Sequence, residues 1–306
     1  MRVRGELRVE RGELIYIERG GEVEISGIAD FDLAKIFECG QCFRWDTDEN
    51  GVYSGVAFGR AARIRRAGGS FFITGTLEDF ESVWFDYFDL RRDYAAIRRR
   101  LCVDAFMREA VEFGTGIRIL RQDSWETLCS FIISQCNNIP RIKKIISSLC
   151  RCFGDRLDFG GNIFYSFPSA ERLAGLEPVD LASLRCGYRA DYIIGAARAV
   201  DSGEVNLAAL AEGSPRVARA VLKTLHGVGD KVADCVMLFG LNMLDAFPVD
   251  VWMKRAVARY YGDGFDPAVF SPYAGIAQQY MFYYMRPRTA RGNHPGPAGH
   301  PSPEGN

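Results

Sequence analysis

The pattern of apolar residues changes once along the chain, near Glu78. Before this point, short segments rich in β-branched and aromatic residues alternate with Gly, Asp and Asn, as strands separated by turns do. After it, longer segments carry apolar residues at helical spacing. The sequence therefore predicts an α+β fold, in which an N-terminal antiparallel β-sheet domain precedes an all-α body.

The expected elements follow from this division. Strands are predicted at 9–17, 22–28, 51–58, 61–65 and 71–75, with one helix among them at 32–37. Helices are predicted at 94–101, 125–135, 139–153, 178–184, 189–200, 215–225, 231–241, 251–261 and 273–285. After residue 286, Pro and Gly dominate and few apolar residues remain, as in disordered segments. We expect an α+β domain at 1–108, an all-α domain at 109–285 and a disordered tail at 286–306.

Histidine and cysteine usage limits the chemistry. The three histidines are His226, His294 and His300, and the last two lie in the Pro/Gly-rich tail. The sequence therefore disfavours a catalytic triad or a metal site that depends on histidine. The nine cysteines form an odd set, and the close pair Cys39 and Cys42 lacks a second CxxC or a suitably spaced histidine. We expect reduced, mostly buried thiols, no metal and no cofactor.

Charge and hydropathy give broader expectations. The formal net charge of −1 provides no global field for a nucleic acid, although a local basic face would suffice to bind one. No apolar run reaches the length of a membrane span, and the chain begins with a polar stretch rather than a secretory segment. We expect a soluble, monomeric, cytoplasmic protein with no membrane partner, located with the chromosome in a prokaryote.

The segment from Ser214 to Lys231 has the pattern of two helices joined by a tight turn. Ser214 followed by proline is a typical helix start. Gly227, Val228 and Gly229 then give a turn with little side-chain obstruction, and Asp230 can cap the next helix. The backbone amides of such a helix-hairpin-helix can bind a DNA phosphate at the positive end of the second helix. A tight interhelical turn without a ligand is the competing interpretation.

Lys231 stands at the N-terminus of the second predicted helix, where the helix dipole disfavours a cation. The same field favours the neutral, nucleophilic amine. Cys235 lies on the same helix face, and Asp250 precedes another predicted helix, where it could also serve as an N-cap. An amine and a carboxylate together suit chemistry at a sugar C1′, because the carboxylate can stabilise oxocarbenium-like charge.

These residues belong to segments that resemble a known family. LHGVGDKVADC at 225–235 and PVD at 248–250 resemble the signature of the helix-hairpin-helix–Gly/Pro-Asp DNA glycosylases. Four further motifs resemble the 8-oxoguanine DNA glycosylase/AP lyase branch, over about 38–286: GQCFRW at 40–45, NNIPR at 137–141, CGYRA at 186–190 and GIAQQYMF at 275–282. The resemblance implies a TATA-binding-protein-like N-terminal sheet and a partner that is double-stranded DNA containing a damaged purine.

The resemblance implies both an activity and the residues that carry it out. The implied activity is base excision repair of 8-oxoguanine, preferably opposite cytosine, through a lysine Schiff base, with AP lyase activity by β-elimination. Lys231 corresponds to the nucleophile and Asp250 to the essential carboxylate. Among the base-binding positions, Gly40 corresponds to the glycine whose carbonyl reads the N7 hydrogen that guanine lacks. Gln278 would contact the base edge, and Phe282 with Cys235 would sandwich the ring.

The resemblance also assigns residues to the gap that a flipped base leaves in the duplex. Tyr188 would wedge into the duplex, and Arg141 and Arg189 would hydrogen-bond the orphaned cytosine. Cys136 departs from the pattern, because the family usually has asparagine there. We expect cytosine selectivity to be reduced as a result.

Three alternatives remain at this point. An endonuclease III-like glycosylase shares the hairpin and its lysine, but usually carries a C-terminal four-cysteine iron–sulfur loop, and no cysteine follows Cys235 here. An alkylpurine glycosylase lacks the hairpin lysine, so Lys231 disfavours it. A non-catalytic helix-hairpin-helix DNA-binding protein needs neither Lys231 nor Asp250.

Overall fold

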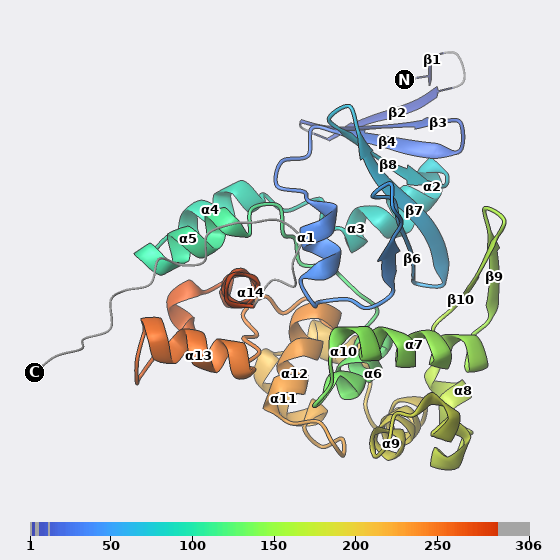
Figure 1. Cartoon of the computed structure of the whole chain (residues 1–306), viewed down its shortest axis with the longest axis vertical. Coiled ribbons are helices and arrows are strands. Elements are labelled where there is room, and N and C mark those ends of the chain that lie inside the picture. Colours follow the sequence, from blue (N-terminus) through green and yellow to red (C-terminus); the bar gives the residue numbers. More distant parts are fainter. Residues whose placement is uncertain (1, 4–5, 12, 287–306) are drawn as a thin grey trace, which may run out of the picture.

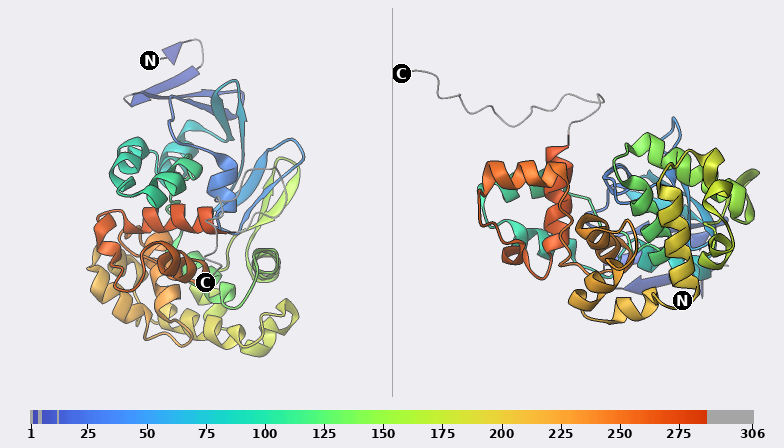
Figure 2. Two further views of the ribbon diagram at one scale, coloured as in Figure 1. Left: turned by 60° about the vertical axis from the view of Figure 1, so that its left-hand side comes forward. Right: turned by 90° about the horizontal axis from the view of Figure 1, so that it is seen from below.

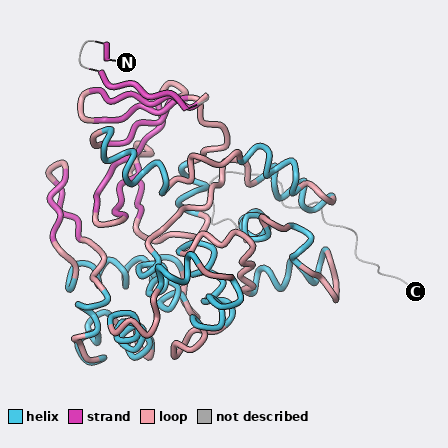
Figure 3. The backbone as a smooth tube through the Cα atoms, turned by 180° about the vertical axis from the view of Figure 1, so that it is seen from behind, coloured by secondary structure: helices cyan, strands magenta, loops and turns pink. Residues whose placement is uncertain are grey.

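Most strands gather at one end of the molecule, and the rest is mainly helical (Figure 1 and Figure 3). The computed structural model describes residues 2–3, 6–11 and 13–286. The predicted α+β fold, a sheet domain followed by a helical body, is confirmed. The predicted disordered tail at 286–306 lies almost wholly outside the described residues, which end at Arg286. The domain boundaries proposed from the sequence stay a prediction.

The described residues of the N-terminal region form an eight-stranded antiparallel sheet in the order β1-β2-β3-β4-β8-β7-β6-β5. Its strands are β1 Arg2–Val3, β2 Glu6–Arg11, β3 Leu14–Arg19, β4 Glu22–Ser26, β5 Trp45–Thr47, β6 Tyr53–Ala57, β7 Arg60–Ala67 and β8 Ser70–Thr74. The single strand predicted at 9–17 is wrong. It is two strands, β2 and β3, which pair with Arg11 opposite Leu14. The short strand β5 was not predicted.

One face of the sheet is buried because its apolar residues recur with period two. Tyr16, Val23, Ile25, Ile64 and Ile73 are at most 1% exposed. They share a hydrophobic core with residues of α1 Leu33–Glu38 and of a helical stretch made of α2 Leu77–Asp79, a π-helical turn Phe80–Trp84 and α3 Phe85–Tyr87. The sequence analysis assigned no element to this stretch.

The helical body has a second core. Its α-helices are α4 Tyr94–Leu101, α5 Ala105–Phe113, α6 Ser124–Ser134, α7 Ile139–Phe153, α8 Ala170–Ala174, α9 Arg189–Asp201, α10 Leu207–Glu212, α11 Pro215–Leu222, α12 Asp230–Cys235, α13 Val251–Tyr260 and α14 Ala274–Met285. The body is not purely helical, because β9 Arg156–Phe159 and β10 Asn162–Tyr165 form an antiparallel hairpin. Helices α5, α8 and α10 were also not predicted. In Figure 2, α14 crosses the middle of the molecule next to α5, where Phe113 stacks on Tyr283 at 5.2 Å.

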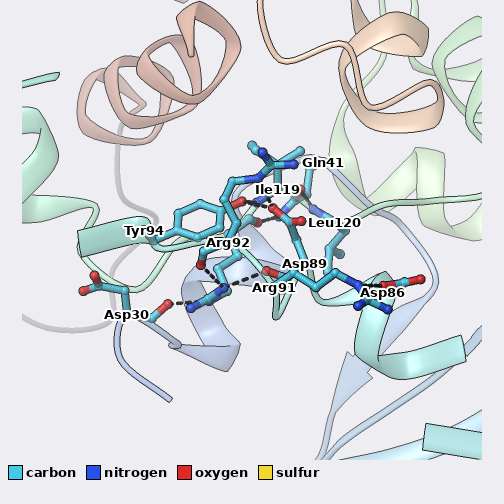
Figure 4. A network of polar contacts seen from close by, with 10 residues as sticks. Asp30, Gln41, Asp86, Asp89, Arg91, Arg92, Tyr94, Ile119 and Leu120 are labelled. Carbon is cyan, nitrogen blue, oxygen red and sulfur yellow. Dashed lines mark hydrogen bonds and ion pairs between the residues drawn. The ribbon is translucent and has the colours of Figure 1, made fainter. Parts of the chain in front are cut away.

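The segment between α1 and β5 lies between the two cores. Cys39 and Phe43 are buried in the helical core, whereas Cys42 and Trp45 are buried in the sheet core. Gln41, fully buried between them, is held by hydrogen bonds to the strand-like stretch 118–120, within a polar network shown in Figure 4. This arrangement fixes the neighbouring Gly40 at the junction of the two cores.

No helix in the described part of the chain is both long and apolar enough to cross a membrane.

Candidate active site

The helix-hairpin-helix predicted from the sequence is formed by α11, the turn at 226–229 and α12. Ser214 caps α11, with its Oγ accepting the Val217 amide at 3.4 Å. Gly227 has φ +84°, and a Cβ at this position would lie 2.2 Å from Cδ2 of Tyr192. Both the backbone conformation and the close approach of the tyrosine ring therefore require glycine.

The expected cap of the second helix is corrected by the structure. Helix α12 begins at Asp230, and Gly229 is its N-cap residue, without a side-chain cap. The Asp230 carboxylate instead accepts a hydrogen bond from Lys223 Nζ at 2.7 Å, which lowers the pKa of Asp230. Asp230 therefore links the start of α12 to the end of α11 rather than capping its own helix.

The hairpin amides differ in availability. The Val228 amide donates to the Leu225 carbonyl at 3.0 Å, and its side chain is 6% exposed. The amides of Gly227 and Gly229 have no acceptor within the described residues, and the space above the Gly229 Cα is open. Phosphate binding by the hairpin stays a prediction. The backbone amides of these two glycines are the ones in the turn that are free to bind a phosphate.

The predicted catalytic and base-binding residues converge on one pocket of about 350 Å³. Its lining contains every position assigned to these roles from the sequence, Gly40, Lys231, Cys235, Asp250, Gln278 and Phe282, together with Phe131, Phe239, Pro248 and Gln279. These positions come from the α1–β5 segment, α6, α12, the residues before α13 and α14. The pocket therefore lies where the sheet domain meets the helical body.

The Lys231 amine is held against α6. Its Nζ donates to Ser134 Oγ at 3.2 Å and lies 5.0 Å from the centre of the Phe131 ring. Phe131 stacks in turn on Phe239 at 5.4 Å with an interplanar angle of 14°. These contacts give the flexible lysine side chain a defined direction beside the pocket.

Asp250 has the cap role as well as a place in the pocket. Its Oδ1 accepts the amides of Trp252 at 3.0 Å and Met253 at 2.9 Å, which makes Asp250 the N-cap of α13. Neither of these bonds uses Oδ2. One carboxylate oxygen thus fixes the side chain while the other is left for the pocket, where Lys231 is also found.

The base-binding side of the pocket contains a buried amide and a buried thiol. Gln278 is 4% exposed, and its Oε1 has no partner among the described residues. A buried acceptor without a donor is costly and often marks a place that a ligand completes. Burial raises the pKa of Cys235 to about 11, against the opposing effect of Lys231, so the thiol is protonated near neutral pH.

The two loops predicted to fill the gap in the duplex lie side by side. Arg141 Nη2 donates to the Arg185 carbonyl at 3.2 Å, which connects the first turn of α7 to the loop before α9. Tyr188 is 50% exposed at the start of α9, as a wedge must be. Cys136 is exposed with φ +48°, a conformation that asparagine adopts more readily than cysteine.

Arg189 is placed differently from Arg141. It is 5% exposed, and its guanidinium donates to the carbonyls of Gln135, Cys136 and Cys186. In this structure Arg189 therefore ties the two loops together. Contact with an orphaned cytosine would require it to exchange a carbonyl partner for the base.

Four pocket residues and Ser134 were missed by sequence reasoning. Phe131 and Ser134 lie three residues apart on α6, just before the NNIPR motif, and this helical spacing puts them on one face. Gln279 is adjacent to the predicted Gln278. The spacing of Phe131 and Ser134 thus indicates a shared helix face, but the sequence does not show that α12 packs against that face.

No group of three or more His, Cys, Asp or Glu side chains that could hold a metal ion occurs in the residues that the structure describes. All nine cysteines are free, and most of them are buried.

Comparisons with known proteins identify the family of the chain. The family model described as the 8-oxoguanine DNA glycosylase N-terminal domain matches residues 25–128, and that of the HhH-GPD superfamily base excision DNA repair proteins matches residues 129–268. An N-glycosylase/DNA lyase from Saccharomyces cerevisiae is 42% identical over 158 residues, which are 48% of this chain and 42% of the yeast protein. The chain thus spans less than half the length of that relative.

Two solved structures cover nearly the whole described fold. MBOgg1, in complex with a low-affinity DNA ligand, is 47% identical with a TM-score of 0.85, over 89% of this chain and 97% of its own. The Clostridium acetobutylicum 8-oxoguanine glycosylase/lyase, bound to double-stranded DNA with cytosine opposite 8-oxoguanine, is 38% identical with a TM-score of 0.83, over 88% and 96%. The two family models and these two structures show that the chain belongs to the bifunctional 8-oxoguanine DNA glycosylase/lyase family of base excision repair enzymes.

Proposed function

We propose that this chain excises 8-oxoguanine from double-stranded DNA and then cleaves the resulting AP site. The observation that carries the proposal is the convergence of Lys231 and Asp250 on one pocket with Gly40, Gln278 and Phe282. The lesion base would enter this pocket after rotating out of the duplex.

In this proposal the protein recognises the lesion through hydrogen-bond acceptors in the pocket, which interact differently with 8-oxoguanine and with guanine. The Gly40 carbonyl accepts the N7 hydrogen of 8-oxoguanine, whereas the N7 lone pair of guanine would face the same oxygen and be repelled. The unpartnered Oε1 of Gln278 would accept a hydrogen bond from the base edge. Phe282 and Cys235 would contact the two faces of the ring.

The reaction proceeds at C1′ of the extruded nucleotide. The neutral Lys231 amine forms a bond to C1′ as the glycosidic bond to N9 breaks, and the bonding pair leaves with the base. The Asp250 carboxylate stabilises the positive charge that develops on the sugar. The departing base takes up at N9 the proton that the new ammonium at C1′ loses. The C1′–O4′ bond then opens with its electron pair going to O4′, which is protonated, and a Schiff base between Lys231 and C1′ remains. Loss of the C2′ proton then expels the 3′ phosphate and so cleaves the strand on the 3′ side.

The opposite base would be read by Arg141 and Arg189, with Tyr188 filling the gap. Guanidinium donors match the O2 and N3 acceptors of cytosine, while adenine presents an N6 donor beside N1. An unpaired buried donor costs about 1–3 kcal/mol, so a preference for cytosine is expected. Because Cys136 lacks the amide of the usual asparagine, we expect the preference to be reduced.

Single-turnover excision from duplexes with 8-oxoguanine opposite each of the four bases tests this function, with borohydride added to trap the Schiff base. We expect fastest excision opposite cytosine and a covalent adduct on every cleaved substrate. Absence of excision in all four duplexes would refute the substrate assignment. Equal rates opposite cytosine and adenine would refute the two arginine assignments alone.

We also infer that the protein acts as a monomer in the cytoplasm, together with the chromosome of a prokaryotic cell. The free state of all nine cysteines supports a reducing compartment. Fractionation of cells producing the tagged chain, with size-exclusion chromatography of the purified protein, measures both properties.

A further inference from the structure

Helix α14 and its C-cap residue hold two successive carbonyl groups, one at the end of α1 and one just after it. Arg286 Nη2 donates to the Glu38 carbonyl at 2.6 Å. Gln279 Nε2 donates to the Cys39 carbonyl at 2.9 Å, and Gln279 is only 2% exposed. One helix therefore fixes the orientation of the two peptide groups that immediately precede Gly40.

The residue after Gly40 is fixed as well. The Gln41 carbonyl accepts a hydrogen bond from Gln122 Nε2 at 2.7 Å. The Gln41 side chain donates to the Arg118 carbonyl at 2.8 Å and accepts the Leu120 amide at 2.9 Å (Figure 4). The Gly40 carbonyl accepts no hydrogen bond within the described residues. In residues 38–41 it is therefore the one carbonyl without a donor, because the carbonyls of its neighbours are all held.

The backbone conformation of Gly40 and the side chains around it leave little room for a different residue at this position. Its φ of +88° is a glycine conformation, and a Cβ would lie 3.4 Å from Phe282 Cε1 and 3.5 Å from Arg286 Nη1. The Arg286 guanidinium also lies 5.7 Å from the Phe282 ring centre. Arg286 thus contacts both the segment that carries the Gly40 carbonyl and the aromatic ring that lines the same pocket.

We propose that Gln279 and Arg286 are specificity-determining positioning residues, which aim the Gly40 carbonyl into the base pocket. This inference rests on the proposed function, in which that carbonyl distinguishes 8-oxoguanine from guanine. The strength of an N–H···O bond falls steeply as its angle departs from linearity, so a rotated peptide loses the attraction to one base and the repulsion of the other. The two residues act through Gly40 and have no part in the chemistry of Lys231.

The test compares two substrates of one enzyme under single-turnover conditions: a duplex with 8-oxoguanine opposite cytosine and the same duplex with an AP site. The variants are Gln279→Met and Arg286→Met, which keep much of the side-chain length but lose the donors. AP-site cleavage needs Lys231 but no base recognition, so it reports on folding and on the amine. We expect the ratio of excision to AP-site cleavage to fall about tenfold in Gln279→Met, the effect of a lost buried hydrogen bond. The fall should be smaller in Arg286→Met, because the bond from Arg286 to Glu38 is exposed.

Two further variants serve as controls. Tyr284→Phe removes the 2.7 Å hydrogen bond from Tyr284 to Glu109, also made by α14 but away from residues 38–41, and its ratio should equal that of the wild type. Arg286→Lys keeps a cationic donor and should recover part of the loss. In equilibrium binding, the preference for 8-oxoguanine over guanine duplexes should fall in parallel with the ratio.

The possible results separate the two proposals. A wild-type protein that cleaves AP sites but leaves 8-oxoguanine in place overturns the proposed function and this inference with it. Suppose instead that the wild type excises 8-oxoguanine, but that both Met variants have the wild-type ratio of excision to AP-site cleavage or lose both activities equally. The positioning role of Gln279 and Arg286 is then overturned, and the proposed function stands.

Discussion

The Asp250 carboxylate accepts two backbone amides at the start of α13 and lines the pocket that also contains Lys231. Asparagine is as good an N-cap as aspartate, so Asp250→Asn removes the charge and keeps the cap. We expect excision to slow by about a hundredfold to a thousandfold, the usual cost of losing one electrostatic stabiliser, with DNA affinity little changed. Single-turnover rates measure this effect. A loss of about tenfold or less, about 1.4 kcal/mol, would reduce Asp250 to a helix cap.

Lys231 supplies the only amine that lines the pocket among the described residues. Lys231→Gln should abolish both excision and borohydride trapping, because the amide that replaces the amine is not a nucleophile at C1′. Binding to lesion-containing DNA should largely remain, as measured by fluorescence anisotropy. A trapped adduct formed at wild-type yield would show that another residue attacks the sugar.

Cys136 combines an unusual backbone conformation with an exposed side chain, and its carbonyl accepts a hydrogen bond from Arg189. Asparagine tolerates φ +48° better, so Cys136→Asn should raise the free energy of unfolding by about 1 kcal/mol. Its amide should also sharpen the preference for cytosine over adenine in single-turnover excision. Cys136→Ala is the matched control, because it keeps the strained backbone and adds no amide. An unchanged cytosine-to-adenine ratio in Cys136→Asn would show that position 136 does not read the opposite base.

At the scale of elements, α11 and α12 are joined by an ion pair between the half-exposed Arg219 and the buried Asp234. Asp234 is 4% exposed, and burial raises its pKa from 3.8 to about 6 against the opposing effect of Arg219. The folded protein therefore binds this proton more tightly than the unfolded chain does. As a result, the contribution of Asp234 to the free energy of unfolding falls as the pH rises from about 4 to about 6.

The variant Asp234→Asn has no such titration. We expect the stability of the wild type relative to this variant to fall by about 2 kcal/mol between pH 4 and pH 6.5, following the relation between pKa shift and free energy. Urea unfolding of both proteins at several pH values measures the difference. A difference that rises with pH would mean that the attraction of Arg219 outweighs burial.

The elements that sequence reasoning located are those whose signals are local. Ser214, Gly227 and Gly229 specify the hairpin through capping and backbone conformation, and α14 was predicted from helical spacing alone. The hairpin β9–β10 was missed because its strands are short and largely exposed, with weak alternation. Within the site, motif positions such as Lys231 and Gln278 were found. Ser134 and Arg286 were not, because their roles come from contacts between elements far apart in sequence.

At the scale of the whole molecule, Arg44 connects three parts of the chain. It donates to Glu126 on α6 at 2.9 Å and to the Tyr165 carbonyl on β10, from the segment that leads into the sheet. The side chains of Arg44 and Glu126 are 9% and 15% exposed. Arg44→Met would leave a buried carboxylate unpaired, which should lower the free energy of unfolding by about 3–5 kcal/mol.

The double variant Arg44→Met/Glu126→Leu removes both charges and should recover most of that loss, because an apolar pair of similar volume often replaces a buried ion pair at little cost. Denaturant unfolding of the two variants and the wild type gives the comparison. A single variant within about 1 kcal/mol of the wild type would show that the pair behaves as a surface ion pair does.

The segment 39–45 contributes alternate side chains to both hydrophobic cores, with Gly40 at their junction. Lys231 and Asp250, in contrast, are attached to α12 and α13 within the helical body alone. Thermal fluctuation of either core would therefore disturb the Gly40 carbonyl, which we propose reads the lesion, while only fluctuation of the helical core would disturb the Lys231 amine. We therefore expect that warming towards the unfolding transition abolishes the discrimination between bases before it abolishes the cleavage of AP sites. Fidelity, rather than turnover, would then set the upper working temperature.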